Sequence, residues 1–165
     1  MVEKIAIVTD STCDLPKAIV EEYGIHVLPL RIIYQNGEYR DNVEITPEEV
    51  YGSLEEEVPT TSLPYPTDVQ SLLEQLKEEG YSHVLAIHIS SGLSGTSQMI
   101  NNVAEQVKGL VVKVVDSKSI SLGLGFTVLE AAKAIRNNTD FNSLCDHVQG
   151  VINRMKVYFV LDTLE

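Results

Sequence analysis

The sequence predicts an α/β protein with an open, mostly parallel sheet, helices on both faces of that sheet and an inserted β-hairpin. Two observations support this fold class. Short segments rich in Val and Ile run with little polar interruption, as is typical of parallel strands buried on both faces. Segments with apolar residues at helical spacing alternate with them, and such alternation is typical of a parallel sheet with right-handed crossovers.

Five segments have the composition of buried strands. In chain order they are KIAIVTD (4–10), IHVLPLRIIY (25–34), HVLAIHIS (83–90), VVKVVDS (111–117) and KVYFVLD (156–162). The second segment is followed closely by Asn36-Gly37, a dipeptide strongly preferred in two-residue hairpin turns. We therefore expect a β-hairpin at this point, inserted into the strand–helix alternation.

Three apolar stripes with helical spacing predict helices between the strands. They are formed by Val69, Leu72, Leu73 and Leu76; by Met99, Ile100, Val103 and Val107; and by Phe141, Leu144, Val148, Val151 and Ile152. The first helix is expected to begin near Pro66-Thr67-Asp68, because proline is favoured at the first helical position. Gly80 is expected to end it, since glycine is the usual residue after a helix terminus.

Composition limits the function classes. A chain of 165 residues can bury a sizeable core without disulfides, and we expect residues 1–165 to form one domain. The net charge of −12 argues against a nucleic-acid partner, because proteins bind the phosphate backbone through clustered Lys and Arg. No apolar run reaches the length of a membrane span, so we expect no stable membrane insertion. Cys13 and Cys145 lack the spacing of a metal site, and the amino-terminal residues lack a signal core. We therefore expect a cytoplasmic protein.

The acidic residues are not evenly spread along the chain. Glu48-Glu49 and Glu55-Glu56-Glu57 form two acidic stretches close together. They could dock on a basic face of a partner protein. A solvated helix face is the favoured interpretation, because isolated surface charges usually contribute little to binding or stability.

Four polar loops are expected on or near the edge of the sheet where ligands gather, at the carboxyl ends of the strands. Three of them follow strands, at Thr9–Thr12, Ser90–Thr96 and Asp116–Ser119, and the fourth, Thr60–Pro64, precedes a helix. Hydroxyls at such junctions usually cap helices. Capping is therefore the favoured interpretation for the loops Thr9–Thr12 and Asp116–Ser119.

The Ser90–Thr96 loop offers more than a cap requires. It contains four hydroxyls and two glycines, and glycines let the backbone approach a ligand closely. The helix that follows should present free amides and a partial positive charge, which favour an anion. This loop therefore predicts an anion site that needs neither Lys nor Arg.

Catalytic motifs are not recognisable in the loops. Ser94 does not lie in a G-x-S-x-G elbow, and no Gly-Lys-Ser/Thr sequence follows to form a P-loop. His83 and His88 lie five residues apart on one strand, so they should point to opposite faces and cannot share a metal. A binding protein is the leading hypothesis. The alternatives are a metal-dependent phosphotransferase or hydrolase with Asp10 and Asp116 at the metal, and a purely structural or interaction module.

Five motifs together resemble the DegV family of bacterial fatty-acid-binding proteins. They are IVTDSTCDLP (7–16), TTSLP (60–64), HISSGLSGT (88–96), VVDSKSISLGLG (114–125) and FVLDTLE (159–165), and their order and spacing match along essentially the whole chain. The resemblance implies that residues 1–165 form the N-terminal α/β lobe of a two-lobed protein whose C-terminal lobe is absent from this chain.

The resemblance also implies a function and a site. Such a protein binds a long-chain fatty acid and presents it to a separate ATP-dependent fatty acid kinase, which forms an acyl phosphate for phospholipid synthesis. It is a carrier subunit, not an enzyme, with no catalytic residue, metal or cofactor. On this sequence the carboxylate contacts map to Thr61 and Ser62, and to Ser94 with the backbone around Gly95. The family adds an Arg and commonly a His from the C-terminal lobe, which has no counterpart here.

The position of a fatty-acid tail has two interpretations. Gly123 and Gly125, within the apolar segment Ile120–Phe126, could open space for a hydrocarbon chain. The same segment could equally be the apolar start of a helix in the core.

Overall fold

Four parallel strands form the main sheet of the computed structural model, which describes residues 3–158 and 160. In spatial order they are β2 (His26–Leu28), β1 (Ile5–Asp10), β6 (His83–His88) and β7 (Val111–Asp116). Every neighbouring pair in this sheet is parallel. The predicted open parallel sheet is therefore confirmed, and its strands lie where the Val- and Ile-rich segments predicted them.

The predicted strand over residues 25–34 is wrong as a single strand. It divides at Pro29 into β2 and β3 (Arg31–Tyr34), which belong to different sheets. Proline cannot donate a ladder hydrogen bond, and the next amide, of Leu30, donates to Ser11 Oγ at 3.1 Å instead of to a strand. The chain thereby leaves the parallel sheet at this point.

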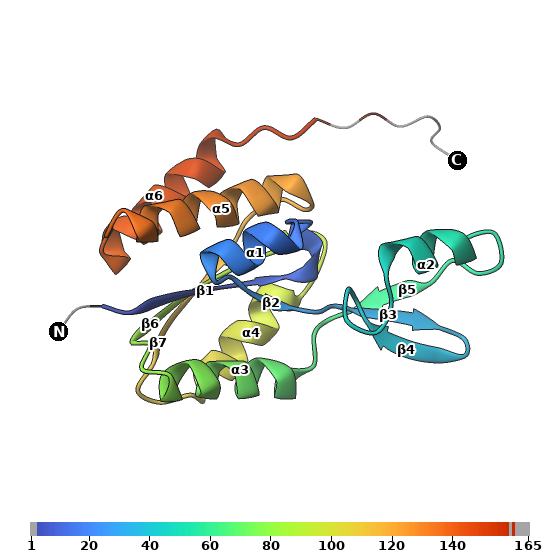
Figure 1. The fold of residues 1–165 in the computed structure, drawn as a ribbon, viewed down its shortest axis with the longest axis horizontal. Helices are drawn as coiled ribbons and strands as arrows, with labels where there is room; N and C mark the ends of the chain where they lie inside the picture. The colour runs from blue at the N-terminus through green and yellow to red at the C-terminus, as the bar shows by residue number, and fades with distance from the viewer. Residues whose placement is uncertain (1–2, 159, 161–165) are drawn as a thin grey trace.

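A second sheet contains the predicted hairpin. Its order is β4 (Gly37–Arg40), β3 and β5 (Thr60–Ser62), and both pairings are antiparallel. Tyr34 pairs with Gly37, so the two turn residues are Gln35 and Asn36, one position earlier than the dipeptide suggested. The hairpin is confirmed, and β5 enlarges it to three strands at one end of the molecule (Figure 1).

The fifth predicted strand, over residues 156–162, is not found in the part of it that the structure describes. Residues 156–158 and 160 have no regular secondary structure. The rest of that segment, and with it most of the FVLDTLE motif, lies outside the described residues.

Helices cover both faces of the parallel sheet, as predicted. α3 (Pro66–Glu78) and α4 (Thr96–Ala104) lie on one face, and α1 (Lys17–Tyr23), α5 (Leu122–Arg136) and α6 (Phe141–Arg154) lie on the other (Figure 1). The three predicted helices are confirmed, and α3 begins at Pro66. A 3-10 turn, η1 (Ser11–Cys13), follows β1, and the short α2 (Pro47–Ser53) lies beside the second sheet.

The core consists of two layers, one on each side of the parallel sheet. Leu85 and Ile87 of β6 pack towards α5 and α6, whereas Val84 and Ala86 pack towards α3 and α4. All four side chains are fully buried, and burying a Leu or Ile contributes about 1.5–3 kcal/mol. His83 lies with its ring centroid 4.6 Å from that of Phe141 in α6. His88 therefore points to the opposite face, as the strand spacing predicted.

Candidate functional site

Three of the predicted polar loops meet at the carboxyl edge of the parallel sheet. The Ile89 amide donates to Asp10 Oδ2 at 3.0 Å, which joins the end of β6 to the end of β1. The Ser90 amide donates to the Ser119 carbonyl, and the Ser121 amide donates to the Thr12 carbonyl, each at 2.8 Å. The loops after β1, β6 and β7 therefore form one connected edge.

Asp10 is the centre of this edge. Its carboxylate is fully buried and accepts hydrogen bonds from the Thr12 amide at 3.1 Å, the Thr12 hydroxyl at 2.5 Å and His88 Nδ1 at 2.9 Å, besides the Ile89 amide. Burial acts to raise the pKa of Asp10, but the hydrogen bonds, with that from His88 the strongest, outweigh burial and leave the pKa below its ordinary value. Asp10 caps η1, as the favoured interpretation predicted.

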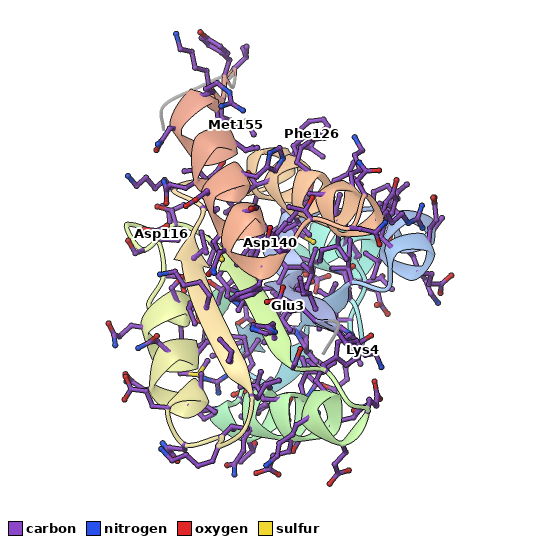
Figure 2. All side chains as sticks on the ribbon, turned by 90° about the vertical axis from the view of Figure 1, so that its left-hand side faces the viewer. Glu3, Lys4, Asp116, Phe126, Asp140 and Met155 are labelled. Carbon is purple, nitrogen blue, oxygen red and sulfur yellow. The ribbon has the colours of Figure 1, made fainter. Side chains whose placement is uncertain are left out.

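Asp116 ends β7 and is labelled in Figure 2. Unlike Asp10 it caps no helix, because α5 begins after Ser121 and has no side-chain cap, so the capping interpretation of the 116–119 loop is wrong. Asp116 accepts from the Ser91 amide at 3.1 Å, the Ser91 hydroxyl at 2.5 Å and the Lys118 amide at 2.8 Å. Partial burial acts to raise the pKa of Asp116, but these hydrogen bonds lower it overall. The carboxylate thereby fastens the 90–96 loop to β7.

The metal-site alternative is not favoured by this geometry. Asp10 and Asp116 lie on strands that flank β6, so about 10 Å of sheet separates their backbones. Each carboxylate is already satisfied by a separate set of donors. Among the residues that the structure describes, no three His, Cys, Asp or Glu side chains are grouped so that they could hold a metal ion.

Ser94 and Gly95 lie directly before α4. Ser94 Oγ lies 2.8 Å from Thr96 Oγ1 and accepts the Thr96 amide at 3.3 Å, so it satisfies one of the free amides of the first turn. A hydroxyl has one donor and two acceptor positions, which leaves Ser94 able to bond one further group. Ser94 is half-buried and Gly95 is exposed, with no atom within 4 Å of the position where a Cβ would stand. A ligand can therefore approach the backbone there.

Thr61 and Ser62 lie in β5, at the edge of the second sheet. Thr61 is exposed, and Ser62 is half-buried because the guanidinium of Arg31 on the neighbouring β3 donates to its hydroxyl at 2.7 Å. Arg31 Nε also donates to the Leu63 carbonyl at 2.6 Å. An anion at Thr61 and Ser62 would consequently lie beside a permanent cation.

The sequence did not single out Arg31. The expectation of an anion site without Lys or Arg concerned the 90–96 loop, whereas Arg31 supports the 60–64 loop. Burial acts to lower the pKa of Arg31, but hydrogen bonds and charge from Glu38 and Tyr65 raise it overall. The centroid of the Tyr65 ring lies 4.7 Å from the guanidinium carbon of Arg31 and 5.2 Å from that of Arg40. Arg40 in turn bonds Asp68 in the first turn of α3 at 3.1 Å. This network fixes the 60–64 loop between the second sheet and α3.

The structure does not join the two predicted ligand loops to each other. No hydrogen bond among residues 3–158 connects Thr61 or Ser62 with Ser94 or Gly95. Each loop is held by its own supports, Arg31 for the first and Asp116 for the second. Their shared role towards one ligand therefore stays a prediction.

The glycines of α5 do not open a pocket. A Cβ at Gly123 would stand 2.0 Å from Ser119 Oγ and 2.8 Å from Val157, and a Cβ at Gly125 would stand 2.3 Å from the Cys13 carbonyl oxygen. These glycines allow α5 to pack closely against η1 and the loop after β7. The interpretation of the segment as a helix start in the core is therefore favoured over a tail pocket at the glycines.

Apolar side chains are nevertheless exposed near this edge. Leu124 is fully buried, but Leu122 and Phe126 are each 55% exposed and Ile120 is 43% exposed. Figure 2 shows Phe126 pointing away from the body of the molecule. Leu93, in the 90–96 loop, is also exposed.

A groove of about 560 Å³ has η1 and α1 on one side and residues 41–47, which follow β4, on the other. Its apolar walls come from Leu15, Val20, Val27 and Val43, and Asp41 lies among them. Burial raises the pKa of Asp41 above its ordinary value. The apolar walls of the groove suit a hydrocarbon chain. The groove lies beside η1, the turn that Asp10 caps.

Comparison with known proteins identifies the family of this chain. The family model described as uncharacterised protein, DegV family, matches residues 4–165. The chain belongs to the DegV family. A DegV domain-containing protein of Clostridium acetobutylicum is 44% identical over 163 residues, which are 99% of this chain and 58% of that relative. The chain thus spans little more than half the length of the relatives it matches.

Two solved DegV structures that share the fold are described as fatty acid binding. The Thermus thermophilus DegV family protein superposes with a TM-score of 0.83 and 36% identity, over 91% of this chain and 54% of that protein. DegV of Bacillus subtilis gives a TM-score of 0.87 and 32% identity, over 92% and 54%. In this DegV chain, no helix of the described residues is both long and apolar enough to cross a membrane.

Proposed function

We propose that this DegV protein binds a long-chain fatty acid and presents it to a separate ATP-dependent fatty acid kinase, which forms the acyl phosphate. Thr61, Ser62 and Ser94 are the proposed carboxylate contacts, together with the backbone at Gly95. The proposal depends on one observation: two hydroxyl-bearing loops are each held in place by hydrogen bonds. One lies beside the Arg31 guanidinium and the other at the start of α4. The fatty acid binding described for the Thermus and Bacillus proteins supports it.

The expected energies divide between tail and head group. Burying about fifteen methylenes at roughly 0.8 kcal/mol each gives on the order of 12 kcal/mol before the costs of association. One hydrogen bond to a charged carboxylate adds about 1.5–3 kcal/mol. The tail therefore supplies most of the affinity, and the hydroxyls determine which end of the fatty acid faces the kinase.

A carrier role fits the chemistry of the loops better than catalysis by this chain. His88 Nδ1 is bonded to Asp10, and the buried Nε2 of His88 bonds no hydroxyl of the described residues. Ser94 Oγ is bonded to Thr96 instead of to a base. Ser82 Oγ does lie 2.9 Å from His83 Nδ1, but at the opposite edge of the sheet, where the same hydroxyl accepts the Lys4 amide. Among residues 3–158, no hydroxyl of the candidate site is hydrogen-bonded to a general base that would make it a nucleophile.

Replacing Ser94 or Thr61 by alanine is expected to weaken fatty acid binding by about ten- to a hundredfold, since each change removes one hydrogen bond to a charged group. Displacement of a fluorescent fatty acid by palmitate measures the affinity of each variant. Ser71→Ala is a matched control, because Ser71 is an exposed hydroxyl on α3 outside the site. Affinities equal to that of the control in both variants would remove these residues from the head-group site.

A further inference from the structure

Residues 43–58 form a surface that combines exposed apolar side chains with concentrated negative charge. We define the acidic α2 surface as Tyr51, Leu54 and Val58 together with Glu48, Glu55 and Glu56. Tyr51 is 72% exposed, Val58 is 74% exposed and Leu54 is 41% exposed. Figure 1 shows α2 at the end of the molecule, away from the helices that cover the parallel sheet. We propose that this surface docks a protein partner that presents Lys or Arg side chains around an apolar contact.

The charge of the segment points to a basic partner. Residues 43–58 contain six glutamates and no lysine or arginine, so they carry half of the net charge of −12. Three of these glutamates have structural roles, because their carboxylates bond Arg40, Thr46 and the Gln35 amide. The carboxylates of the other three, Glu48, Glu55 and Glu56, make no hydrogen bond or ion pair with residues 3–158. Their carboxylates are therefore available to a partner.

The shape beside the surface suits a cationic side chain. A groove of about 460 Å³ lies between the β3–β4 hairpin and α2. Tyr34 and Tyr39 form aromatic walls, and Glu56 supplies a free carboxylate there. The carboxylates of Glu49 and Glu57 also line the groove but already bond Thr46 and the Gln35 amide. Aromatic faces and carboxylates together are the usual surroundings of a bound guanidinium or ammonium group.

Other occupants fit the charge less well. A second copy of this chain would bring two acidic surfaces together, and like charges in one interface are unfavourable. The position of the surface in the chain also favours one partner, the fatty acid kinase. Val58 precedes Thr61 by three residues, so a protein docked here would lie beside the proposed carboxylate loop. This inference rests on the proposed function, because it takes the partner to be the kinase that must reach the fatty-acid carboxylate.

Charge reversal tests the docking surface with the purified kinase as the probe. The test variant carries Glu48→Lys, Glu55→Lys and Glu56→Lys. The control carries Glu78→Lys, Glu105→Lys and Asp146→Lys, at exposed positions in or directly after other helices. Both variants change the net charge equally. We expect the test variant to bind the kinase at least about tenfold more weakly and the control to bind it as the wild type does, while both bind palmitate normally. A Tyr51→Ser, Val58→Ser variant should lose kinase affinity without losing its salt dependence.

Three results distinguish the possibilities. Equal kinase affinities of the test and control variants, or a wild type that binds no kinase, would overturn the docking surface. Loss of palmitate binding or of thermal stability in the test variant would also overturn it, because the surface would then be covered within the protein itself. Kinase binding that depends on the surface, with no palmitate bound by any form, would support the docking surface and refute the proposed function.

Discussion

Replacing Asp10 by alanine is expected to destabilise the protein by about 3–5 kcal/mol, because several buried donors lose their acceptor and each unsatisfied donor costs about 1–3 kcal/mol. The change deletes the acceptor of four hydrogen bonds at a fully buried position. It leaves His88 Nδ1 and the Ile89 amide without a partner in the core, and each unsatisfied group adds to the cost. The loops after β1 and β6 should lose their common anchor.

Denaturant unfolding measures this effect, with Asp146→Ala as the control because Asp146 is exposed on α6. The pKa of Asp10 is lower in the folded protein than in the unfolded chain. Its contribution to stability is therefore complete above the unfolded pKa and is lost as the pH falls through the folded pKa. The wild type should lose stability in acid more steeply than Asp10→Ala. A destabilisation below about 1 kcal/mol would show that the buried network contributes no more than an ordinary hydrogen bond.

A Gly125→Ala change is expected to destabilise the protein by about 1–3 kcal/mol, and Gly125→Leu by more, because both overpack the contact between α5 and η1. The new Cβ would stand 2.3 Å from the Cys13 carbonyl oxygen, which is backbone and cannot move aside alone. Either α5 or the turn after β1 must shift to relieve the clash. Weaker fatty acid binding by such a variant would therefore report a displaced edge and not a filled tail pocket.

Thermal unfolding of Gly125→Ala and Gly52→Ala provides the comparison. Gly52 lies in α2, with no atom within 4 Å of the position of a Cβ, so alanine there should be neutral or slightly stabilising. We expect the melting temperature to fall only for Gly125→Ala. Equal melting temperatures would mean that α5 and η1 do not pack as closely as the structure shows.

Most of the parallel sheet, and three of the five helices that cover it, could be predicted because their signals are local. Continuous Val and Ile runs mark β1, β6 and β7, and apolar stripes mark α3, α4 and α6. The break at Pro29 was missed although proline is itself a local signal against a continuous strand, because the residues on both sides of it are strand-like. Which sheet a strand joins depends on pairing with distant segments, and no local pattern of residues 25–34 reveals it.

The candidate site shows the same division. Its hydroxyl loops could be found from composition, whereas their supports could not. Arg31 reaches Ser62 through antiparallel pairing across 31 residues, and Asp10 reaches His88 across 78 residues. The only available signals were the acidic residue that ends β1 and the hairpin turn before β4. The roles of Gly123 and Gly125 were similarly undecided, because a glycine indicates close approach without indicating what approaches.

Native mass spectrometry of the delipidated protein, loaded with palmitate or with methyl palmitate, tests the central claim most directly. The two ligands share the tail, but only palmitate carries the carboxylate that Thr61, Ser62 and Ser94 are proposed to hold. We expect one palmitate to remain bound and to be released on denaturation, with much less methyl palmitate retained. A protein that binds neither ligand, or that retains both equally, would contradict a carboxylate site at these hydroxyl loops.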